Sequence, residues 1–595
     1  MTTTGNAQLR LSLDGDWFFK ADPEQQGITM HWQADSTDKS GWEVHVTPRF
    51  WEGYPGMAGY DGWGWYARTF QLPRVGEHLS IHFAGVDDDA QVWVNGIDVG
   101  SHTGYSDPFV VDITPAVQEG VNTIVVLVKD YAGGGGIYKP VTLVDTRHLD
   151  DLLRSEFADK PARKSAEWVR DAVIYEVYLR SFSKEGTFDG LKRRLPELRN
   201  LGVTVLWLMP VHPVGVKNRK GTLGSPYAVQ DYYAINPAFG TMADFKLLLA
   251  AVHRLGMKLI IDLVANHTSW DSKLMEEHPA WFTHDAQGAI VPPNADWTDV
   301  ADLDYSHREL RDYMIAMMRW WVKDVGIDGF RCDVAEMVPT DFWEEARAQL
   351  NRIKPVMMLS EGSLPEQHLK AFDLTYSWNM YDILPVLLEG KRPVSLIDDI
   401  LKTESLQFPV GSLRMRFNTN HDKNAWDQPA VLKYGQDGLR LTAVFVNTIP
   451  GVPLMYTGEE VANDRKLALF EKVDVDWTRP RDMGDLYTAL AKLRREHKAL
   501  TRGGMTPLHT AHSRDVYAFL RNAGKDKIIV VLNFASAPRF TNVEIPMGKL
   551  FPGAASVGLK DWFSGDLQEV KAAGTEQIVL ALEPRDYRVF VVDER

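Results

Sequence analysis

The sequence predicts a multidomain α/β and β protein, in which a (β/α)₈ TIM barrel is flanked by an N-terminal and a C-terminal β-sandwich. Three observations predict this fold class. The chain has 595 residues, more than one hydrophobic core normally serves. Its middle alternates short apolar runs with helical patterns, which is typical of a parallel sheet. Its two ends carry short strand-like runs separated by turn signals, which is typical of β-sandwiches.

The N-terminal region, residues 1–150, is expected to form the first β-sandwich. Alternating strand-like runs occur at His78–Phe83 and Ala90–Val94, and Asn95-Gly96 signals a tight turn directly after the second run. Many short strands separated by such turns indicate a sandwich. Tryptophans that alternate with polar residues are interpreted as its core: Trp17, Trp65 and Trp93.

The middle region, residues 170–500, is expected to form the barrel. A charged linker at 151–169 precedes it. Eight near-continuous apolar runs alternate there with helical patterns, as in a closed parallel barrel. The runs lie near Val173, Val203, Lys258, Gly329, Val356, Ala371, Leu413 and Val452. Apolar residues at three- and four-residue spacing predict helices such as Phe245–Leu255, Leu310–Val325 and Asp485–His497.

Two further segments complete the predicted organisation. The stretch from about 268 to 308 is a short excursion between the third strand and the next helix, and is expected to form a short domain B. Residues 501–595 return to β patterning, with runs such as Val516–Leu520 and Lys527–Asn533. This pattern predicts a second, smaller sandwich.

Composition excludes several classes of partner. The net charge of −15, from 65 basic and 80 acidic residues, argues against nucleic acid and anionic membranes as partners. Cys332 is the single cysteine, so no intrachain disulfide is expected. No basic and apolar leader opens the sequence, and no apolar stretch approaches the ~20 residues of a membrane span, so a cytoplasmic location is expected. The oligomeric state is left open, with a dimer as one option.

Polar groups follow four of the apolar runs. The segments are Asp262 to His267, Gly329 to Asp333, Ser360 to Gly362, and Asn420 to Asp422. Because the carboxyl ends of barrel strands meet at one face, these groups are expected to converge there. Three of them form a carboxylate cluster of the kind that glycoside hydrolysis needs: Asp333, Glu361 and Asp422.

The residue types also predict individual roles. Arg331 and Asp333 are two apart on one strand, so they share a face, and the guanidinium favours an ionised carboxylate nucleophile. Glu361 follows apolar residues and is expected to be a proton donor whose pKa is raised by burial. Asp422 could stabilise positive charge on a sugar ring. His267 and His421 suit hydrogen bonds to sugar hydroxyls.

In order and spacing, these segments resemble the signature regions of the alpha-amylase family, glycoside hydrolase family 13. The resemblance implies Asp333 as nucleophile, Glu361 as acid/base and Asp422 as transition-state stabiliser. It also places Arg331, His267 and His421 around the sugar at the cleavage point, and implies retention of anomeric configuration.

The same resemblance extends to further residues. The segment Gly224 to Tyr232 is similar to the family segment whose tyrosine stacks on that sugar, which implies Tyr227 in this role. Asp262 opens the first signature region and is assigned to substrate binding. Asn266 resembles a calcium ligand of the family, although partner carboxylates cannot be identified in the short loop that follows. No cofactor is expected to be required.

Two departures from the family pattern bear on specificity. Many alpha-amylases carry a Lys-His pair three residues after the nucleophile, where this chain has Glu336 and Met337. The excursion after His267 is also short. Both departures predict a preference for short maltooligosaccharides over starch.

The N-terminal region resembles a different family. Segments around Trp17, Trp65 and Tyr138 are similar to the sugar-binding jelly roll that opens family 2 β-glycosidases. A glycine-rich loop offers aromatic side chains for two interpretations, contact with a glycan or packing within the protein. They are Trp51, Tyr54, Tyr60 and Trp63.

The expected function is that of a retaining hydrolase of α-1,4-glucosidic bonds in maltooligosaccharides or starch-like glucans. The rivals within the class are a cyclomaltodextrinase, a neopullulanase or an α-glucosidase, with or without transglycosylation. A family 2 β-glycosidase needs two glutamates at strand ends, and the pairs Arg331/Asp333 and His421/Asp422 do not fit it. A non-catalytic glucan-binding homologue would typically lack a catalytic acid, and all three are present.

Overall fold

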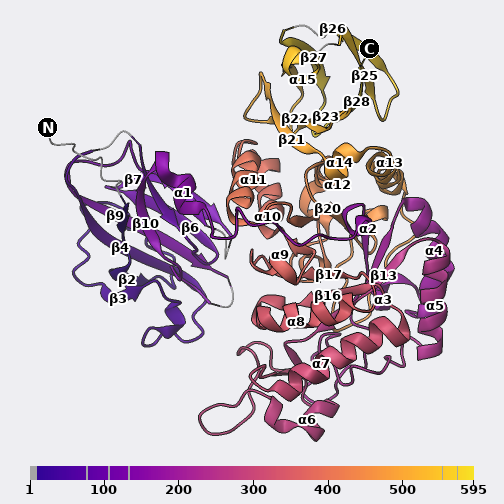
Figure 1. The fold of residues 1–595 in the computed structure, drawn as a ribbon. Helices are drawn as coiled ribbons and strands as arrows, with labels where there is room; N and C mark the ends of the chain where they lie inside the picture. Colours follow the sequence, from indigo (N-terminus) through magenta and orange to yellow (C-terminus); the bar gives the residue numbers. More distant parts are fainter. Residues whose placement is uncertain are drawn as a thin grey trace, which may run out of the picture. The chain divides into compact units, whose positions relative to one another are not determined.

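The computed structural model describes residues 10–75, 78–104, 108–131, 134–552, 554–571 and 574–594. It consists of two compact units that divide between Arg154 and Ser155. Figure 1 labels their elements along the chain. Each unit is described by itself.

The second unit contains a closed barrel of eight parallel strands, which confirms the predicted fold class. Strand β11 pairs with both β12 and β20, and this pairing closes the barrel. In order around the barrel the strands are β11 (Ile174–Val177), β12 (Val205–Leu208), β13 (Lys258–Val264), β16 (Gly329–Asp333), β17 (Met357–Ser360), β18 (Leu374–Tyr376), β19 (Leu413–Arg416) and β20 (Val452–Tyr456).

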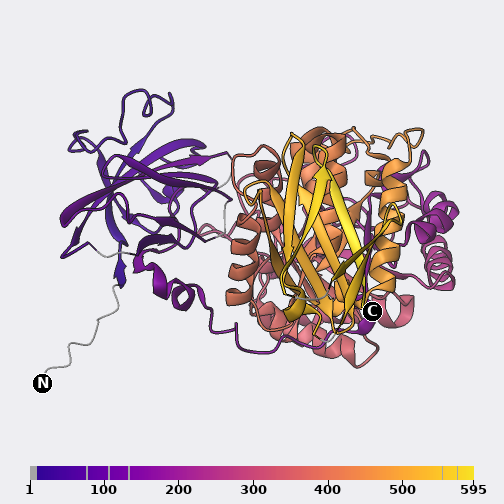
Figure 2. The ribbon, with the colours of Figure 1, turned by 90° about the horizontal axis from the view of Figure 1, so that it is seen from above.

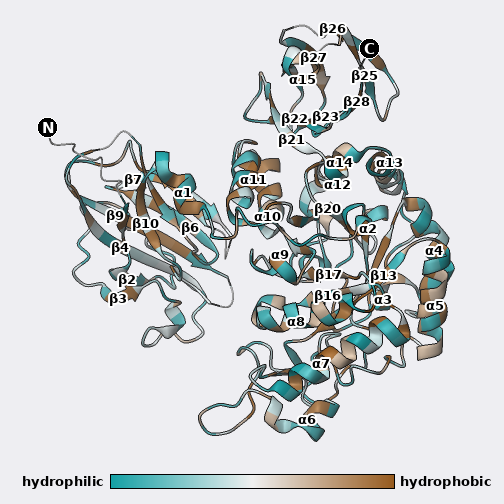
Figure 3. Ribbon diagram, in the orientation of Figure 1, coloured by the Kyte–Doolittle hydropathy of each residue, from teal (hydrophilic) through white to brown (hydrophobic). Residues whose placement is uncertain are grey.

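Helices separate the barrel strands along the chain. They are α3 (Leu179–Phe182), α4 (Phe188–Leu201), α5 (Met242–Arg254), α7 (Arg308–Trp320), α8 (Thr340–Asn351), α9 (Gln367–Lys370), α10 (Trp378–Leu388), α11 (Leu396–Gln407) and α12 (Ala430–Thr448). After the last barrel strand follow α13 (Asp482–Glu496) and α14 (Lys498–Arg502). Figure 3 shows both hydrophilic and hydrophobic residues on α4 and α5. Their apolar residues, such as Leu191 and Phe245, are buried. An amphipathic helix of this kind covers a sheet and faces solvent at once.

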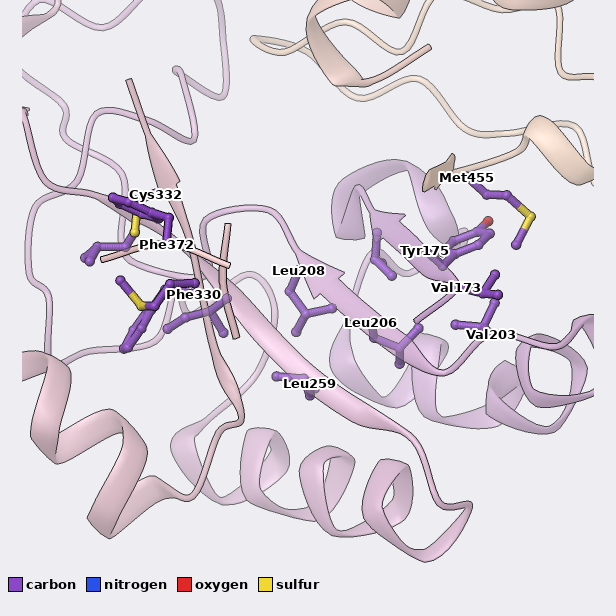
Figure 4. Packing of buried hydrophobic residues seen from close by; sticks show 14 of the residues in the cluster. Val173, Tyr175, Val203, Leu206, Leu208, Leu259, Phe330, Cys332, Phe372 and Met455 are labelled. Atoms are coloured by element: carbon purple, nitrogen blue, oxygen red, sulfur yellow. The ribbon is translucent and has the colours of Figure 1, made fainter. Parts of the chain in front are cut away.

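Side chains alternate along each barrel strand between two separate cores. On β12, Leu206 and Leu208 belong to the core beneath the helices, whereas Val205 and Trp207 belong to the core inside the barrel. Figure 4 shows the outer set from close by, with Leu206, Leu208 and Leu259 among the labelled residues. This alternation decides which residues at the strand ends can reach the central face.

Gly329 opens β16 at a point of close backbone contact. A Cβ added there would lie 2.0 Å from the main-chain oxygen of Met357 on β17, and the residue has φ +148°. A side chain at this position would therefore push the two strands apart. The glycine that begins the segment Gly329 to Asp333 is explained by this contact.

Domain B follows β13 as an excursion with little regular structure. It contains β14 (His267–Ser269), paired antiparallel with β15 (Val300–Asp302), and the short helix α6 (Lys273–Glu277). Helix α7 resumes the barrel at Arg308.

The second half of the segment predicted as a linker is held to the barrel unit by hydrogen bonds. The main-chain nitrogen of Ala162 donates to Val410, and that of Arg163 donates to His368. The Arg163 guanidinium also pairs with buried Asp373. A short helix, α2 (Glu167–Arg170), then leads into β11.

The C-terminal region is a single eight-stranded antiparallel sheet in the order β26-β25-β28-β23-β22-β21-β24-β27 (Figure 2, yellow). Its strands are β21 (Gly504–Thr510), β22 (Val516–Ala523), β23 (Asp526–Asn533), β24 (Arg539–Ile545), β25 (Ser556–Asp561), β26 (Leu567–Lys571), β27 (Glu576–Leu582) and β28 (Tyr587–Glu594). Residues of β24 and β27 share one core with residues of β22, β23 and β28. The two ends of the sheet therefore face each other, as in a sandwich.

The first unit is built from two antiparallel sheets, as predicted. One runs β3-β2-β4-β9-β6-β7 and the other β1-β10-β5-β8. Their bounds are β1 (Arg10–Ser12), β2 (Gly15–Ala21), β3 (Glu43–Thr47), β4 (Gly62–Leu72), β5 (Leu79–Phe83), β6 (Asp89–Val94), β7 (Ile97–Thr103), β8 (Phe109–Asp112), β9 (Gly120–Asp130) and β10 (Val141–Asp145). A core of residues from both sheets lies between them.

The aromatic residues of the N-terminal loop mostly pack inward. Trp51 is fully buried and Tyr54 is 4% exposed, and both belong to the core of the first unit. The Trp51 indole donates to the main-chain oxygen of Tyr60 (3.0 Å). Glycan contact by Trp51 and Tyr54 is therefore wrong, because the rings fill the core. Trp17, Trp65 and Trp93 are buried, as expected.

Across the described ranges, every helix falls short of the length and apolar character that crossing a membrane requires. The lone cysteine, Cys332, is buried in β16.

Candidate active site

The ends of the barrel strands bring the predicted polar residues together. Asp262, Arg331 and Asp333 lie at the ends of adjacent strands, where Asp262 is in register with Arg331. Their neighbours Ile261, Phe330 and Cys332 belong to the core beneath the helices. By alternation the three polar side chains point to the barrel axis, where their mutual contacts are found.

Arg331 lies at the centre of the site and is fully buried. Its Nη1 is 2.8 Å from both Asp262 Oδ1 and Asp333 Oδ1, and its Nη2 is 2.8 Å from Glu361 Oε2. Its Nε also donates to the Tyr376 hydroxyl at 3.3 Å. One guanidinium thus contacts three carboxylates from three consecutive strands. It donates hydrogen bonds to Asp262 and Asp333 and makes a close ionic contact with Glu361.

The carboxylates outnumber the charge that Arg331 supplies. Burial raises the pKa of Asp333 well above its ordinary value, and the neighbouring carboxylates add to this, although Arg331 acts in the opposite direction. Burial likewise raises the pKa of Glu361, against the effect of Arg331. Arg331 does favour the ionised form of Asp333, as predicted, but its effect on the pKa is smaller than the opposite effect of burial. The pair Asp333 and Glu361 therefore holds a proton readily, as an acid and a nucleophile require together.

Val334 connects the two carboxylates through its backbone. It directly follows Asp333 and adopts a left-handed conformation with φ +36°, which is strained for a β-branched residue. Its main-chain nitrogen donates to Glu361 Oε2 at 2.8 Å. The strained turn thus fixes one oxygen of Glu361 and leaves the other for a proton.

His421 is held in its charged form by two acids. Its Nδ1 is 2.5 Å from Glu176 Oε1, and its Nε2 is 3.3 Å from Asp422 Oδ2. Burial disfavours the charged imidazole, but Asp422 and Glu176 outweigh burial and raise the pKa of His421 to about 9. The other histidine, His267, is 3.9 Å from Asp333 Oδ2, and burial lowers its pKa to about 3. The site therefore contains one charged and one neutral imidazole near neutral pH.

The predicted residues divide between a cavity wall and the layer beneath it. The cavity has a volume of about 360 Å³ and is lined by residues that include Tyr227, His267, Asp333, Glu361, His421 and Asp422. Asp262 and Arg331 are fully buried and lie beneath this wall. Asp262 accepts hydrogen bonds from the Tyr227 hydroxyl (3.1 Å) and from the Trp207 indole (3.2 Å). Its position fits a residue that orients others.

Tyr227 packs on His421 with its ring nearly parallel, at 5.3 Å between centroids. Its hydroxyl lies 2.7 Å from His421 Nε2. Contacts with His421 and Asp262 therefore hold Tyr227 in place. Its ring lines the cavity beside the carboxylates.

Several residues of the site were missed by the sequence analysis. Glu176, at the end of β11, is fully buried and bonded to His421. The signal for it was an acid within an otherwise apolar strand, Val173 to Leu179. The cavity wall also contains three large aromatic residues outside the barrel strands and the long helices, where sequence patterns carry little information. They are Trp297, Trp426 and Phe470.

The Asn266 side chain contacts one carboxylate, that of Asp302. The Asn266 amide lies 3.4 Å from Asp302 Oδ1, whose other oxygen accepts from Thr283 (2.6 Å). Ca²⁺ takes six to eight oxygen ligands. Among the described residues, three or more acidic, histidine or cysteine ligand atoms converge only at Asp87, Asp88 and Asp130 of the first unit. Calcium at Asn266 stays an untested expectation, and no chemistry here is derived from it.

Replacing Glu176 by Gln should move the alkaline limb of the pH profile. The amide keeps a hydrogen bond to His421 but removes one of the two charges that raise its pKa. His421 then loses its proton at lower pH. We therefore expect the alkaline limb of the kcat/KM profile to shift to lower pH by about one unit. The control is Glu167→Gln, on an exposed helix. Superimposable profiles for the two variants would show that Glu176 has no such role.

Family models and known proteins resemble both units of the chain. Residues 152–297 and 280–506 match the model "Alpha amylase, catalytic domain", and residues 10–139 match "Glycosyl hydrolases family 2, sugar binding domain". Alpha-amylase MalA of Haloarcula japonica is 27% identical over 507 residues, which are 80% of this chain and 67% of that protein.

Two solved structures share the fold. A noncanonic maltogenic alpha-amylase, AmyB of Thermotoga neapolitana, is 32% identical with a TM-score of 0.65, covering 72% of this chain and 99% of that one. An alpha-amylase from Lactobacillus plantarum is 31% identical with a TM-score of 0.62, covering 71% and 99%.

Proposed function

Since the chain belongs to the alpha-amylase family of glycoside hydrolases, we propose that it is a retaining enzyme that cleaves α-1,4-glucosidic bonds in maltooligosaccharides and related glucans. One observation carries this proposal. Asp333 and Glu361 lie in the wall of one cavity and both contact the Arg331 guanidinium at 2.8 Å. A retaining glycosidase needs two carboxyl groups ~5–5.5 Å apart, and two carboxylates that share one guanidinium fit this requirement.

The chemistry proposed for the site runs in two displacements. Asp333 attacks the anomeric carbon while Glu361 protonates the leaving oxygen, so the glycosidic bond breaks as the glycosyl-Asp333 ester forms. Glu361, now ionised, takes a proton from water, and this water displaces Asp333 from the sugar. Asp422 lies beside His421 at the same wall, where its carboxylate can stabilise the positive charge that develops on the ring.

The imidazoles and the tyrosine fit contacts with the sugar at the cleavage point. His267 is neutral and can accept or donate a hydrogen bond. Charged His421 can only donate, and because Nδ1 is bound to Glu176, its Nε2 is the atom that can reach a sugar hydroxyl. Tyr227 borders the same space with its ring. A neutral sugar with both hydroxyl donors and acceptors matches this mixture of groups.

Two residues that follow Asp333 bear on substrate length, although Glu336 and Met337 do not line the cavity. Glu336 accepts a hydrogen bond from the main-chain nitrogen of Ser363, and Met337 is 48% exposed, so neither offers the donors of a basic pair. Lys220 lines the cavity, but it is already bound to Asp299 (3.1 Å) and to the main-chain oxygen of Asp296 (2.8 Å). The expectation that short maltooligosaccharides are cut with higher kcat/KM than starch remains a prediction.

Trp426 should be a binding platform at the edge of this cavity. Its side chain is 63% exposed although it is large and apolar, and it packs edge-on against Phe470 at 5.6 Å. Such a ring can stack on the apolar face of a sugar. We expect Trp426→Ala to raise KM for maltoheptaose about tenfold and leave kcat nearly unchanged. The matched control is Leu432→Ala, an exposed apolar residue on α12 outside the cavity wall, and equal KM values for both variants would contradict the role.

A product panel tests the proposed function. The enzyme is incubated with maltoheptaose, β-cyclodextrin, pullulan and p-nitrophenyl α-glucoside, and the first product is followed by NMR. We expect cleavage of maltoheptaose with the α-anomer formed first. Faster turnover of β-cyclodextrin, pullulan or the p-nitrophenyl glucoside would instead identify a cyclomaltodextrinase, a neopullulanase or an α-glucosidase. A β-anomer would exclude retention.

A further inference from the structure

A second hollow of the same unit lies between the barrel and the C-terminal sheet. It has a volume of about 670 Å³, within the range of small-molecule sites. Three segments line it: helix α12, the turn between β25 and β26, and the turn between β27 and β28. It shares no lining residue with the catalytic cavity. It is called the C-terminal hollow below.

Two aromatic rings lie in this wall. Phe563 is 37% exposed, in the turn after β25. Its ring meets that of half-buried Tyr587 edge-on, with centroids 5.2 Å apart. An exposed phenyl ring held in place by a second ring presents an apolar surface of defined orientation, which suits the apolar face of a sugar.

Charged groups of both signs surround the rings. The lining contains five acids and three arginines. On α12, Asp437 is exposed and Arg440 lies 3.4 Å from Asp482; on β28, Arg588 pairs with Asp586 at 2.8 Å. Carboxylates accept and guanidinium groups donate, so both kinds of hydrogen bond are available to vicinal hydroxyls.

The balance of charge selects the class of ligand. An excess of acids disfavours phosphates, nucleotides and other anions. A metal ion is also disfavoured, because the acids of this hollow do not converge as a ligand group among the described residues. An uncharged, polyhydroxylated molecule with an apolar face remains, which describes an oligosaccharide.

We propose that the C-terminal hollow is a second carbohydrate site, which binds a segment of α-1,4-glucan chain without cleaving it. The choice of an α-glucan rests on the proposed function. Among the described residues of the hollow, Arg440 contacts Asp482 and Arg588 contacts Asp586, and no guanidinium contacts two acids as Arg331 does. We therefore expect this site to hold the polymer while the catalytic cavity cleaves another segment.

Calorimetric titration with maltoheptaose tests this site in the full chain. In an Asp333→Asn background, which prevents turnover, we expect two molecules bound per chain. Adding Phe563→Ala should reduce this to one, whereas adding Phe540→Ala should leave two, because Phe540 is 72% exposed on β24 but is not part of the hollow. The Asp437→Ala variant, which alters an exposed polar group, should weaken the second site about threefold or more.

The outcomes separate the two proposals. Equal stoichiometry in the Phe563 and Phe540 variants, or a single site in the Asp333→Asn background, overturns the C-terminal hollow as a binding site. Two sites with no hydrolysis of maltoheptaose by the unmodified enzyme would overturn the proposed function and keep the hollow. With Phe563→Ala alone, we expect unchanged kcat/KM on p-nitrophenyl maltoside and a KM for amylopectin raised about threefold; an unchanged KM for amylopectin would contradict the polymer-holding role.

Discussion

Asp333→Asn should lower kcat on maltooligosaccharides by about 10⁴-fold or more, because an amide cannot form the glycosyl ester. The side chain keeps its size and its place beside Arg331, so substrate affinity should change little. The measurement is steady-state hydrolysis of maltoheptaose, with binding followed separately by calorimetry. An activity above about a tenth of the unmodified enzyme would show that another residue is the nucleophile.

The same substitution should not destabilise the protein. Three carboxylates contact the Arg331 guanidinium, and burial together with mutual repulsion raises the pKa of Asp333. Removing one acid relieves that repulsion and leaves Arg331 paired with Asp262 and Glu361. We expect an unchanged or higher Tm near neutral pH, since active sites commonly trade stability for function. The control, Asp61→Asn at an exposed position before β4, should leave both activity and Tm unchanged.

The fold was predictable because its signal is repetitive. Each barrel strand is buried on both faces and so reads as an apolar run, and all eight predicted runs coincide with strands of the closed barrel. Gly329 and the residues after it form a further local signal, since only a glycine permits the approach to Met357. The strand ends then placed Asp262, Arg331 and Asp333 on one face by alternation alone.

The remainder of the site depends on contacts between distant segments. Glu176 and His421 are 245 positions apart, so their hydrogen bond leaves no spacing pattern in the sequence. Trp426 comes from a short helical segment, Lys423–Asp427, and Phe470 from a loop, and nothing in their local sequence distinguishes an exposed platform from a core residue. In the N-terminal loop the local sequence is misleading in the other direction. The glycine-rich sequence around Trp51 is typical of an exposed loop, but the Trp51 side chain is buried in the core.

The protonation state of the carboxylates also could not be predicted from neighbouring residues in the sequence. The Arg331 and Asp333 pair predicts an ionised carboxylate when considered alone. Burial and the charges of Glu361, Asp262 and Asp422 reverse the direction of the pKa shift, and these three acids come from three other parts of the chain. Their sum can be obtained only when the barrel has brought them together.

The activity lost by the Glu361→Gln variant should depend on whether the leaving group needs a proton. Glu361 lies 2.8 Å from Arg331 and accepts from the Val334 main-chain nitrogen at the same distance, and burial raises its pKa, so it is held as a proton donor. A glutamine fills the space and cannot donate this proton. A sugar alkoxide is a poor leaving group, so we expect kcat on maltoheptaose to fall about 10³-fold, within the range of general acid catalysis.

Fluoride leaves without protonation, which isolates this role of Glu361. On α-maltosyl fluoride the Glu361→Gln variant should form the glycosyl-enzyme nearly as fast as the unmodified protein, and the intermediate should accumulate because no base activates water. Rapid-quench mass spectrometry would detect an ester on Asp333. The alkaline limb of the maltoheptaose pH profile should also lose its dependence on Glu361, because a general acid is inactive once it has ionised. If both substrates lose activity equally and no ester accumulates, Glu361 acts in binding, and the proton must come from a different acid of the cluster.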